Sequence, residues 1–257
     1  AKTFQENGHE VPILVFRPGG HLHTAENLEG LKVQILQGFD SKVALWAPGL
    51  IKQISDLSPE IILCMGRTAN CYAGRIHRKF PDIPVIGTIR TGKVLFPLHQ
   101  WSLKHVRAIM VNSNWWKRRL LEHGIADERV YVVHNSLLLD RAEEERAAQR
   151  MALRKEFAIP DSTCVYLNVA TFRSGKRHLD LLDVFASLRK NRPELDWRLW
   201  LVGDGREYNR CKCWAAENGL GTRVRFFHFQ KDPFPFYAAA DVAVSASRED
   251  SLPNFLI

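Results

Sequence analysis

The chain has 257 residues, of which 46% are hydrophobic and 25% are charged, a composition typical of a globular protein with a packed core. It excludes a disordered chain, a fibrous repeat and a small disulfide-stabilised domain. Since domains run to about 100–200 residues, the length predicts two of them. The formal net charge of +8 favours an anionic partner, such as nucleic acid, an acidic membrane face or a phosphorylated small molecule, without choosing among them.

Cysteine usage and apolar runs indicate the compartment. The five cysteines are odd in number and scattered, which predicts reduced thiols in a cytosolic protein rather than a disulfide framework. No apolar run approaches the roughly 20 residues that a membrane-spanning helix needs. Residues 1–8 resemble the end of a helix with a glycine stop and not a signal peptide, so we expect that the natural beginning of the chain is missing.

Short apolar runs rich in β-formers alternate with amphipathic stretches along the whole chain. The strands expected in the first half are Val11–Phe16, Glu60–Cys64, Pro84–Ile89, Ala108–Asn112 and Val130–His134. Those expected in the second half are Cys164–Ala170, Trp197–Val202, Val224–Phe229 and Asp241–Ala246. Helical patterns cover His178–Lys190 and Arg206–Asn218. This alternation predicts βαβ units with parallel sheets.

A strongly charged stretch, Arg141–Ala148, separates the two series of strands. We interpret the segment 136–160 as the passage between two α/β domains, 1–138 and 139–257. Ligands of open α/β sheets bind outside the carboxyl ends of the strands, so the loops that follow strands are the candidate sites.

The first candidate loop, Ala170–Arg177, follows a strand and opens a helix. Arg173, Lys176 and Arg177 would add side-chain charge to the free backbone N–H groups of the helix start, which together form an anion site. The loop is not a Walker sequence, because its leading glycine is absent. A solvated helix start with surface cations explains the same residues about equally well.

Two further loops follow strands in the second half. Gly203-Asp204-Gly205 lets a ligand approach the backbone, although a plain glycine turn explains it as well. Residues 247–255 place Glu249 and Asp250 ahead of an apolar helix start, where the carboxylates bind sugar hydroxyls or merely complement the helix dipole. Three such loops on successive βα units indicate a shared site.

The ordered set of motifs resembles the retaining GT-B glycosyltransferases, the large family-four type that includes bacterial lipopolysaccharide and capsule enzymes. The matching segments of the second half are Asn168–Lys176, Gly203–Gly205, the run from Tyr237 through Ala240 and Asp241 to Ser247, and Asp250–Asn254. Those of the first half are Gly8–Val11, Asn112-Ser113 with Lys117, and Val133–Asn135. The resemblance covers nearly the whole chain.

The resemblance implies an α/β fold of two Rossmann-like domains facing across a cleft, truncated at both ends, with an acceptor-side and a donor-binding domain. It implies transfer of a hexosyl-type sugar from a UDP- or GDP-sugar to a glycan or lipid-linked acceptor, with retention of configuration. The setting would be cell-surface polysaccharide synthesis in the cytoplasm, at the inner face of the membrane. We expect no cofactor, no metal ion and no nucleic-acid partner, and a peripheral contact with an anionic membrane fits a lipid-linked acceptor.

The resemblance also assigns residues in the donor site. Lys176 would hold the donor diphosphate, and Arg173 would substitute for the arginine that the family usually has where Thr171 stands. Asp250 occupies the first position of the acidic pair, which is normally Glu, and would touch the donor sugar. The remaining donor-binding candidates are Thr171, Gly203, Asp204, Gly205, Ser247, Glu249, Ser251 and Leu252. The catalytic residues expected from the resemblance are Lys176, Arg173 and Asp250. Because the leaving diphosphate is anionic, Lys176, Arg173 and a helix N-terminus would meet its charge.

The acceptor-side candidates are Arg90, Arg67 and Asn70, which follow two strands of the first half. Plain surface charge is the competing interpretation of Arg90. Trp115 and Trp116 stand beside three cations, which suits an anionic membrane surface, but we favour one core tryptophan and a solvated cationic face.

Two alternatives to an enzyme remain open from the sequence. The departures at Thr171 and Asp250 motivate a non-catalytic scaffold of GT-B type. The charge of +8 motivates a basic α/β nucleic-acid-binding protein, although the cations are spread along the chain instead of clustering.

Overall fold

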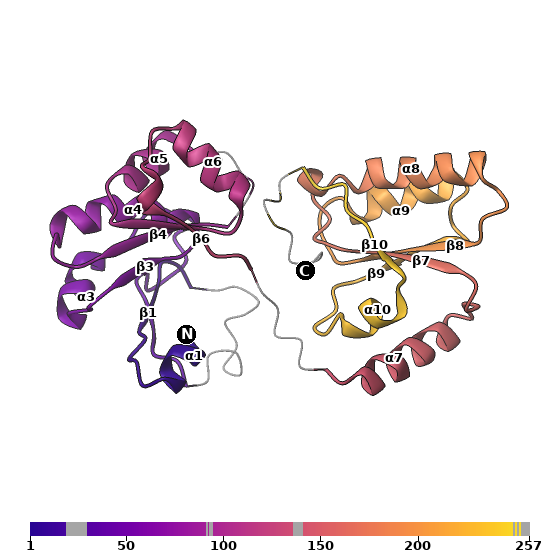
Figure 1. The fold of residues 1–257 in the computed structure, drawn as a ribbon, viewed down its shortest axis with the longest axis horizontal. Coiled ribbons are helices and arrows are strands. Elements are labelled where there is room, and N and C mark those ends of the chain that lie inside the picture. The colour runs from indigo at the N-terminus through magenta and orange to yellow at the C-terminus, as the bar shows by residue number, and fades with distance from the viewer. Residues whose placement is uncertain are drawn as a thin grey trace. The chain divides into compact units, whose positions relative to one another are not determined.

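The computed structural model describes residues 1–18, 30–90, 92, 95–135, 141–248, 250 and 252 (Figure 1). The chain divides into two compact units. The first unit comprises Ala1–Arg90 and Val94–Val133, and the second comprises Thr91–Lys93 and His134–Ile257. Each unit is an α/β structure with its own parallel sheet.

The sheet of the first unit has four parallel strands in the spatial order β3-β4-β5-β6. Their bounds are Ile62–Cys64, Val85–Ile89, Ala108–Val111 and Val130–Val132. A separate parallel pair joins β1 (Ile13–Val15) to β2 (Val33–Ile35). The helices are α1 (Lys2–Glu6), α3 (Leu50–Leu57), α4 (Gly66–Lys79), α5 (Pro97–Lys104) and α6 (Asn114–Glu122), followed by a 3-10 turn η1 (Asp127–Arg129). Helices α4, α5 and α6 gather over one face of the four-stranded sheet (Figure 1).

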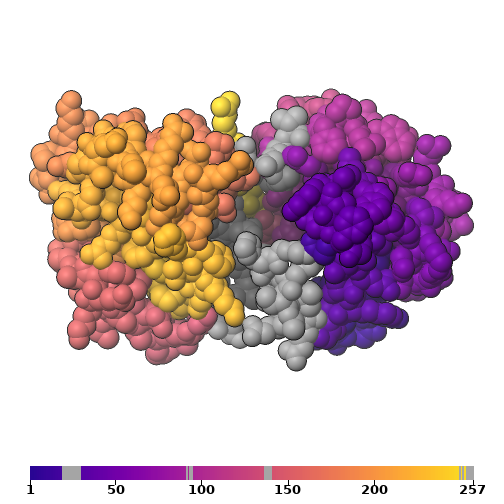
Figure 2. Space-filling model, turned by 180° about the vertical axis from the view of Figure 1, so that it is seen from behind, coloured from indigo at the N-terminus to yellow at the C-terminus, as the bar shows by residue number. Residues whose placement is uncertain are grey.

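The sheet of the second unit is also parallel, with the spatial order β10-β7-β8-β9. The strands are β7 (Cys164–Val169), β8 (Trp197–Val202), β9 (Val224–Phe227) and β10 (Val242–Ala243). The helices are α7 (Glu143–Glu156), α8 (His178–Asn191), α9 (Tyr208–Glu217) and α10 (Phe234–Ala239), with a 3-10 turn η2 at Ser174–Lys176. Helices α8 and α9 cover one face, and α7 and α10 cover the other, side by side in the space-filling view (Figures 1 and 2). Strands β8 and β9 follow one another on one side of β7, whereas β10 lies on the other side of β7, so the strand order reverses at β7.

Both faces of the second sheet are buried, which explains the near-continuous apolar strands. Trp197, Leu199 and Leu201 of β8 pack under α8 and α9, whereas Trp200 and Val202 of the same strand pack with Phe236 of α10. The alternation of strand side chains therefore supplies two cores from one strand.

All nine strands predicted from the sequence are confirmed, most with shorter ends. The helices predicted at His178–Lys190 and Arg206–Asn218 are confirmed as α8 and α9. The strand β2 was not predicted, because it has only three residues and Gln34 interrupts its apolar pattern.

The segment interpreted as a passage between domains is in part an integral element of the second unit. Arg154 of α7 is 3% exposed, and its guanidinium donates to the carbonyls of Ala239 (3.0 Å) and Thr163 (2.6 Å) and to the Asp241 carboxylate (3.2 Å). Burial opposes ionisation of Asp241, but hydrogen bonds from the Val165 N–H, Arg150 and Arg154 outweigh it and lower the pKa of Asp241. A paired buried cation thus fastens α7 to the edge of the sheet.

No helix in the described part of the chain is both long and apolar enough to cross a bilayer.

Candidate functional site

The candidate site lies at the carboxyl edge of the second sheet, where the loops after β7 and β10 meet. The Gly175 carbonyl accepts a hydrogen bond from the backbone N–H of Arg248 (3.0 Å) and one from the Ser247 hydroxyl (3.4 Å). The Lys176 ammonium donates to the Asp250 carboxylate at 2.5 Å. Since β7 and β10 flank the reversal of strand order, these loops occupy the position where open α/β sheets bind ligands.

The Lys176–Asp250 ion pair is partly shielded from water, with side-chain exposures of 18% and 19%. Burial opposes ionisation of Asp250, but the hydrogen bonds from Lys176 and Ser247 and the charges of Lys176 and Arg173 outweigh it. The pKa of Asp250 therefore lies below its ordinary value, and the carboxylate is ionised at neutral pH. The sequence-predicted residues Lys176, Arg173, Ser247 and Asp250 come together here.

Two glycines lock the loop after β8 against the loop after β7. Gly203 has φ +143° and Gly205 has φ +152°, and an added Cβ would lie 2.2 Å from the carbonyl oxygen of Ala170 or Phe172, respectively. The Phe172 N–H donates to the Asp204 carbonyl (2.9 Å), and the Glu207 N–H donates to the Phe172 carbonyl (3.1 Å). Only glycine fits at both positions, because the backbones touch where a side chain would stand. Thr171, in the same turn, is exposed.

The side chain of Asp204 joins a third loop to this arrangement. Its carboxylate lies 2.6 Å from His228 Nδ1 and accepts a hydrogen bond from the Phe229 N–H (2.8 Å). The hydrogen bond from His228, with that of Phe229, lowers the pKa of Asp204. Asp204 therefore ties the loop after β9 to the loop after β8.

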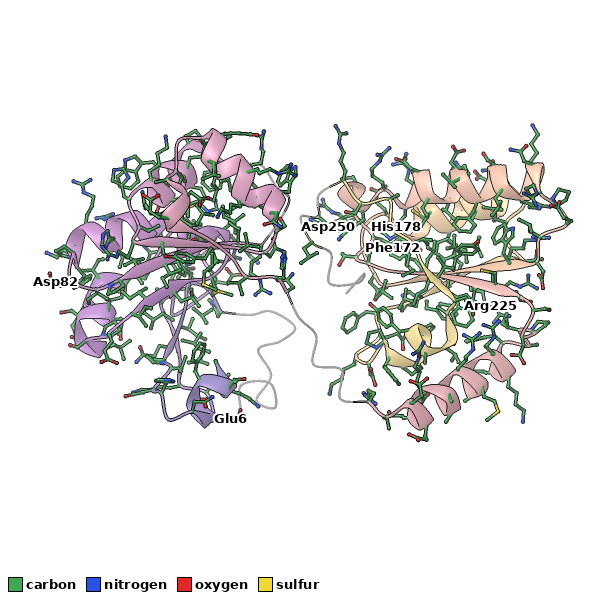
Figure 3. All side chains as sticks on the ribbon, in the orientation of Figure 1. Glu6, Asp82, Phe172, His178, Arg225 and Asp250 are labelled. Atoms are coloured by element: carbon green, nitrogen blue, oxygen red, sulfur yellow. The ribbon has the colours of Figure 1, made fainter. Side chains whose placement is uncertain are left out.

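His178 belongs to the site but was missed by sequence reasoning. It begins α8, is 3% exposed, and stacks on Phe172 with ring centroids 4.1 Å apart and an interplanar angle of 12° (Figure 3). Burial, with the nearby charge of Lys176, lowers the pKa of His178 to about 4, so the ring is neutral at physiological pH. Its place two residues after Lys176 was the only signal in the sequence.

The acceptor-side candidates lie in the first unit, after β3 and β4. Asn70 is fully buried, and its side chain exchanges two hydrogen bonds of 2.8 Å with the backbone of Thr88. It therefore holds strand β4 to helix α4. Arg67 is exposed and lies over the Phe96 ring at 5.6 Å. Arg90 is exposed at the end of β4.

The tryptophans of α6 divide as the favoured interpretation predicted. Trp116 is buried, whereas Trp115 is half-exposed, with Arg119 at 5.7 Å over its ring. Lys117 pairs with Asp127 at 2.7 Å.

Of the remaining donor-binding candidates, Glu249 and Ser251 lie outside the described residues. The Leu252 carbonyl accepts a hydrogen bond from the Asn135 amide at 3.5 Å.

Comparison with protein families identifies both halves of the chain. Residues 1–141 match the family described as Glycosyltransferase Family 4. Residues 149–257 match the family described as Glycosyl transferases group 1. The two matches together include every strand of both sheets.

Similar curated proteins include two lipopolysaccharide 1,6-galactosyltransferases. That of Escherichia coli strain K12 is 22% identical over 200 residues, which cover 72% of this chain and 48% of the relative. That of Salmonella typhimurium strain LT2 is 24% identical over 198 residues, which cover 70% of this chain and 46% of the relative. The chain thus spans about half the length of these relatives.

Similar solved structures confirm the GT-B fold class predicted from the sequence. The complex of Anabaena Alr3699/HepE with UDP and glucose has a TM-score of 0.69 at 18% identity, covering 92% of this chain and 66% of that one. A glycosyltransferase from Rickettsia africae has a TM-score of 0.72 at 18% identity, covering 96% and 67%. At this level of identity the likeness shows the fold.

Proposed function

Because the chain belongs to Glycosyltransferase Family 4, we propose that it transfers a sugar from a nucleotide-diphosphate sugar to a glycan or lipid-linked acceptor. We propose retention of configuration, a hexosyl donor carried on UDP or GDP, and a role in cell-surface polysaccharide synthesis. The relatives named lipopolysaccharide 1,6-galactosyltransferases support the polysaccharide setting, and the neighbour solved with UDP and glucose supports the donor class.

The observation that carries this proposal is the meeting of Lys176 and Asp250 at the reversal of strand order in the second unit. A diphosphate is recognised by cations and backbone N–H groups, and a sugar by carboxylates that accept hydrogen bonds from its hydroxyls. Lys176 with Arg173 supplies the first kind of group, and Asp250 supplies the second. Both kinds stand together where an α/β sheet receives its ligand.

In this scheme the second unit stabilises the departing nucleoside diphosphate. Negative charge grows on the diphosphate as the bond to the sugar breaks, so cations held in place beforehand lower the barrier more than mobile ones. The ionised Asp250 holds the Lys176 ammonium, and Arg173 adds charge close by. The stacked pair of Phe172 and His178 supports the turn that carries Lys176.

The compartment of the reaction is part of the proposal. We place it in the cytoplasm at the inner face of the membrane, where nucleotide sugars and lipid-linked acceptors meet. The cysteines of the chain are all free thiols, which supports a reducing compartment.

The test of the diphosphate assignment is Lys176→Ala. Loss of a charge-assisted hydrogen bond should weaken binding of UDP or GDP by about 1.5–3 kcal/mol, measured by isothermal titration calorimetry. Lys212→Ala, which removes an exposed lysine of α9, is the matched control and should bind as the unchanged chain does. Equal affinity of the Lys176 variant and the unchanged chain would refute the assignment.

The test of the sugar contact is Asp250→Asn. The asparagine side-chain oxygen still accepts a hydrogen bond from the Lys176 ammonium, so this change should largely spare affinity for the free nucleotide. It should reduce discrimination among intact UDP- and GDP-sugars, because the neutral amide accepts weaker hydrogen bonds from hydroxyls. A thermal-shift panel of nucleotides and nucleotide sugars measures both effects at once. If nucleotide and sugar-nucleotide binding decline in parallel, Asp250 does not contact the sugar. Turnover of any donor excludes the scaffold alternative.

A further inference from the structure

The loop that follows β2 is held in one shape by a buried glutamine. Gln37 is 1% exposed, and its amide group donates to the carbonyls of Val43 at 3.1 Å and Trp46 at 2.5 Å. Its side-chain oxygen accepts a hydrogen bond from the Ser41 hydroxyl at 2.7 Å. A polar side chain thus satisfies the backbone of the loop from within. We call residues 37–46 the glutamine loop.

The glutamine loop exposes aromatic and aliphatic side chains. Phe39 is 65% exposed, Val43 is 54% exposed and Trp46 is 41% exposed. The rings of Phe39 and Trp46 have centroids 5.9 Å apart, and their planes are tilted by 50°. Exposed apolar side chains that gather on a rigid loop mark a binding surface. Since the donor-site residues described above all belong to the second unit, this surface needs a separate explanation.

Polar groups that can bind hydroxyls stand next to these rings. The Arg17 guanidinium donates to the Asp40 carboxylate through Nε at 2.7 Å and Nη2 at 3.0 Å, and the Lys42 ammonium lies 3.2 Å from the same carboxylate. Arg17 follows β1 and Asp40 follows β2. The ion pair therefore joins the carboxyl ends of two parallel strands, where α/β sheets bind ligands. A guanidinium has five N–H donors, so Arg17 retains donors that the contact with Asp40 does not use.

We propose that the glutamine loop, together with Arg17, binds a sugar ring of a glycan acceptor. The apolar C–H face of a sugar packs on an aromatic ring, and its hydroxyls accept hydrogen bonds from cationic side chains. Phe39 and Trp46 supply the rings, and Arg17 and Lys42 supply the donors. This inference rests on the proposed function, because it names a sugar as the part of the acceptor that the first unit recognises.

The charges of the glutamine loop favour a sugar over other occupants. Asp40 follows Phe39 directly, so a bilayer that took up the Phe39 ring would also have to accommodate a carboxylate, which anionic headgroups repel. Asp40 also balances the charge of Arg17, which weakens the attraction of the loop for an anion. A neutral ring rich in hydroxyls matches both the paired charges and the apolar side chains.

The test uses the full chain on a printed array of cell-surface oligosaccharides, followed by saturation-transfer difference NMR with the oligosaccharide that binds best. Binding should occur without nucleotide, and the C–H protons of one sugar ring should receive the largest saturation. Phe39→Ala and Trp46→Ala should each weaken binding about tenfold and reduce that saturation, because each removes an aromatic ring. Trp46→Phe keeps a ring and should retain binding to within about threefold. Arg17→Gln should weaken binding about fivefold through lost charge-assisted hydrogen bonds.

Exposed aromatic side chains elsewhere in the first unit provide matched controls. Phe4→Ala and Trp115→Ala remove a phenylalanine that is 59% exposed and a tryptophan that is 45% exposed, and should keep oligosaccharide binding to within about twofold. Absence of binding to every oligosaccharide on the array, or an equal loss in the control variants, would overturn the proposal.

Two further outcomes would assign the glutamine loop to another partner. One is binding to vesicles of phosphatidylcholine and phosphatidylglycerol that Trp46→Ala abolishes while oligosaccharide binding stays intact. The other is self-association of the chain that the same variant abolishes in the same way. Either result would overturn the glycan assignment, because the loop would then face a membrane or a second copy of the chain.

Oligosaccharide binding needs no donor, so this inference and the proposed function fail separately. Phe39→Ala and Trp46→Ala should bind UDP as the unchanged chain does, because the glutamine loop lies outside the donor site. A chain that binds nucleotide but no oligosaccharide would contradict the glycan inference alone. A chain that binds oligosaccharide through the loop but binds no nucleotide would contradict the transferase proposal alone.

Discussion

The two units share a parallel βα plan but use glycine in different places. In the first unit, Gly74 lies where α4 meets α5, and an added Cβ would be 2.8 Å from the Ser102 carbonyl oxygen. Gly87 lies within β4, where a Cβ would be 2.6 Å from Leu103. In the second unit, Gly203 and Gly205 instead press two loops together at the carboxyl edge of the sheet.

Hydrogen-bonding side chains show the same difference. Asn70 of the first unit joins a helix to a strand inside the core. Asp204 and Asp250 of the second unit join loops that follow neighbouring strands. The first unit therefore uses these residues to pack helices on its sheet, whereas the second uses them to hold a set of loops in fixed positions, as a binding site requires.

The largest effect is expected from a substitution that tests how much α7 contributes to the stability of the second unit. Arg154→Ala removes a buried guanidinium that donates to the carbonyls of Ala239, Pro160 and Thr163 and to Asp241. Because the buried carbonyls lose their partner, the free energy of unfolding of the second unit should fall by about 3–5 kcal/mol. Hydrogen exchange followed by mass spectrometry should show faster exchange in β7 and β10 but unchanged protection in β4 and β5. The exposed Arg146→Ala in the same helix is the control, and comparable losses in both variants would contradict the assignment.

The next effect tests the difference in glycine use. Gly203→Ala places a methyl group against the Ala170 carbonyl at φ +143°, and should cost about 2–4 kcal/mol of stability together with a large loss of UDP affinity. Gly74→Ala should also destabilise the protein but leave UDP affinity intact, because it lies in the first unit. Urea titration and calorimetry measure the two quantities.

Gly221→Ala is the neutral control for both glycine variants, because an added Cβ there meets nothing within 4 Å. If Gly74→Ala weakens UDP binding as much as Gly203→Ala does, the division of roles between the two units is wrong.

The smallest effect is a dependence of stability on pH, for which each unit contains one buried histidine, His99 in the first and His178 in the second. Burial, with the charge of Arg67, lowers the pKa of His99 to about 4, and His178 of the second unit has a pKa of about 4 for a similar reason. As pH falls below about 6.5, both histidines become protonated in the unfolded chain, whereas in the folded protein they stay neutral until about pH 4. Stability should therefore be complete above pH 6.5 and decline by about 2–3 kcal/mol per histidine between pH 6.5 and 4.

Single substitutions separate the two contributions. His178→Phe should remove the pH dependence of unfolding in the second unit only, and His99→Phe that in the first unit only. Hydrogen exchange at pH 7 and pH 5, corrected for the intrinsic exchange rate, follows both units in one experiment. A pH dependence that persists in the double variant would assign it to other groups.

The sequence by itself determined the strands and the loops that follow them. Apolar runs such as Trp197–Val202 are local signals, since a strand buried on both faces must be apolar at nearly every position. The lysine loop at Lys176 and the glycines at 203 and 205 were also found, because a glycine or a cation directly after a strand is visible without knowledge of the fold.

Only the tertiary structure decided which of these loops meet. Lys176 and Asp250 are 74 residues apart, and they pair because β10 adds to the free edge of β7 instead of continuing beyond β9. Burial was equally hidden, since asparagine and arginine, the residue types of Asn70 and Arg154, usually lie at the surface, and histidine, as at His178, is buried only in some cases. Local pattern fixes what each segment forms, but strand order and packing depend on contacts between distant segments, and those contacts turned polar residues into parts of a core and a site.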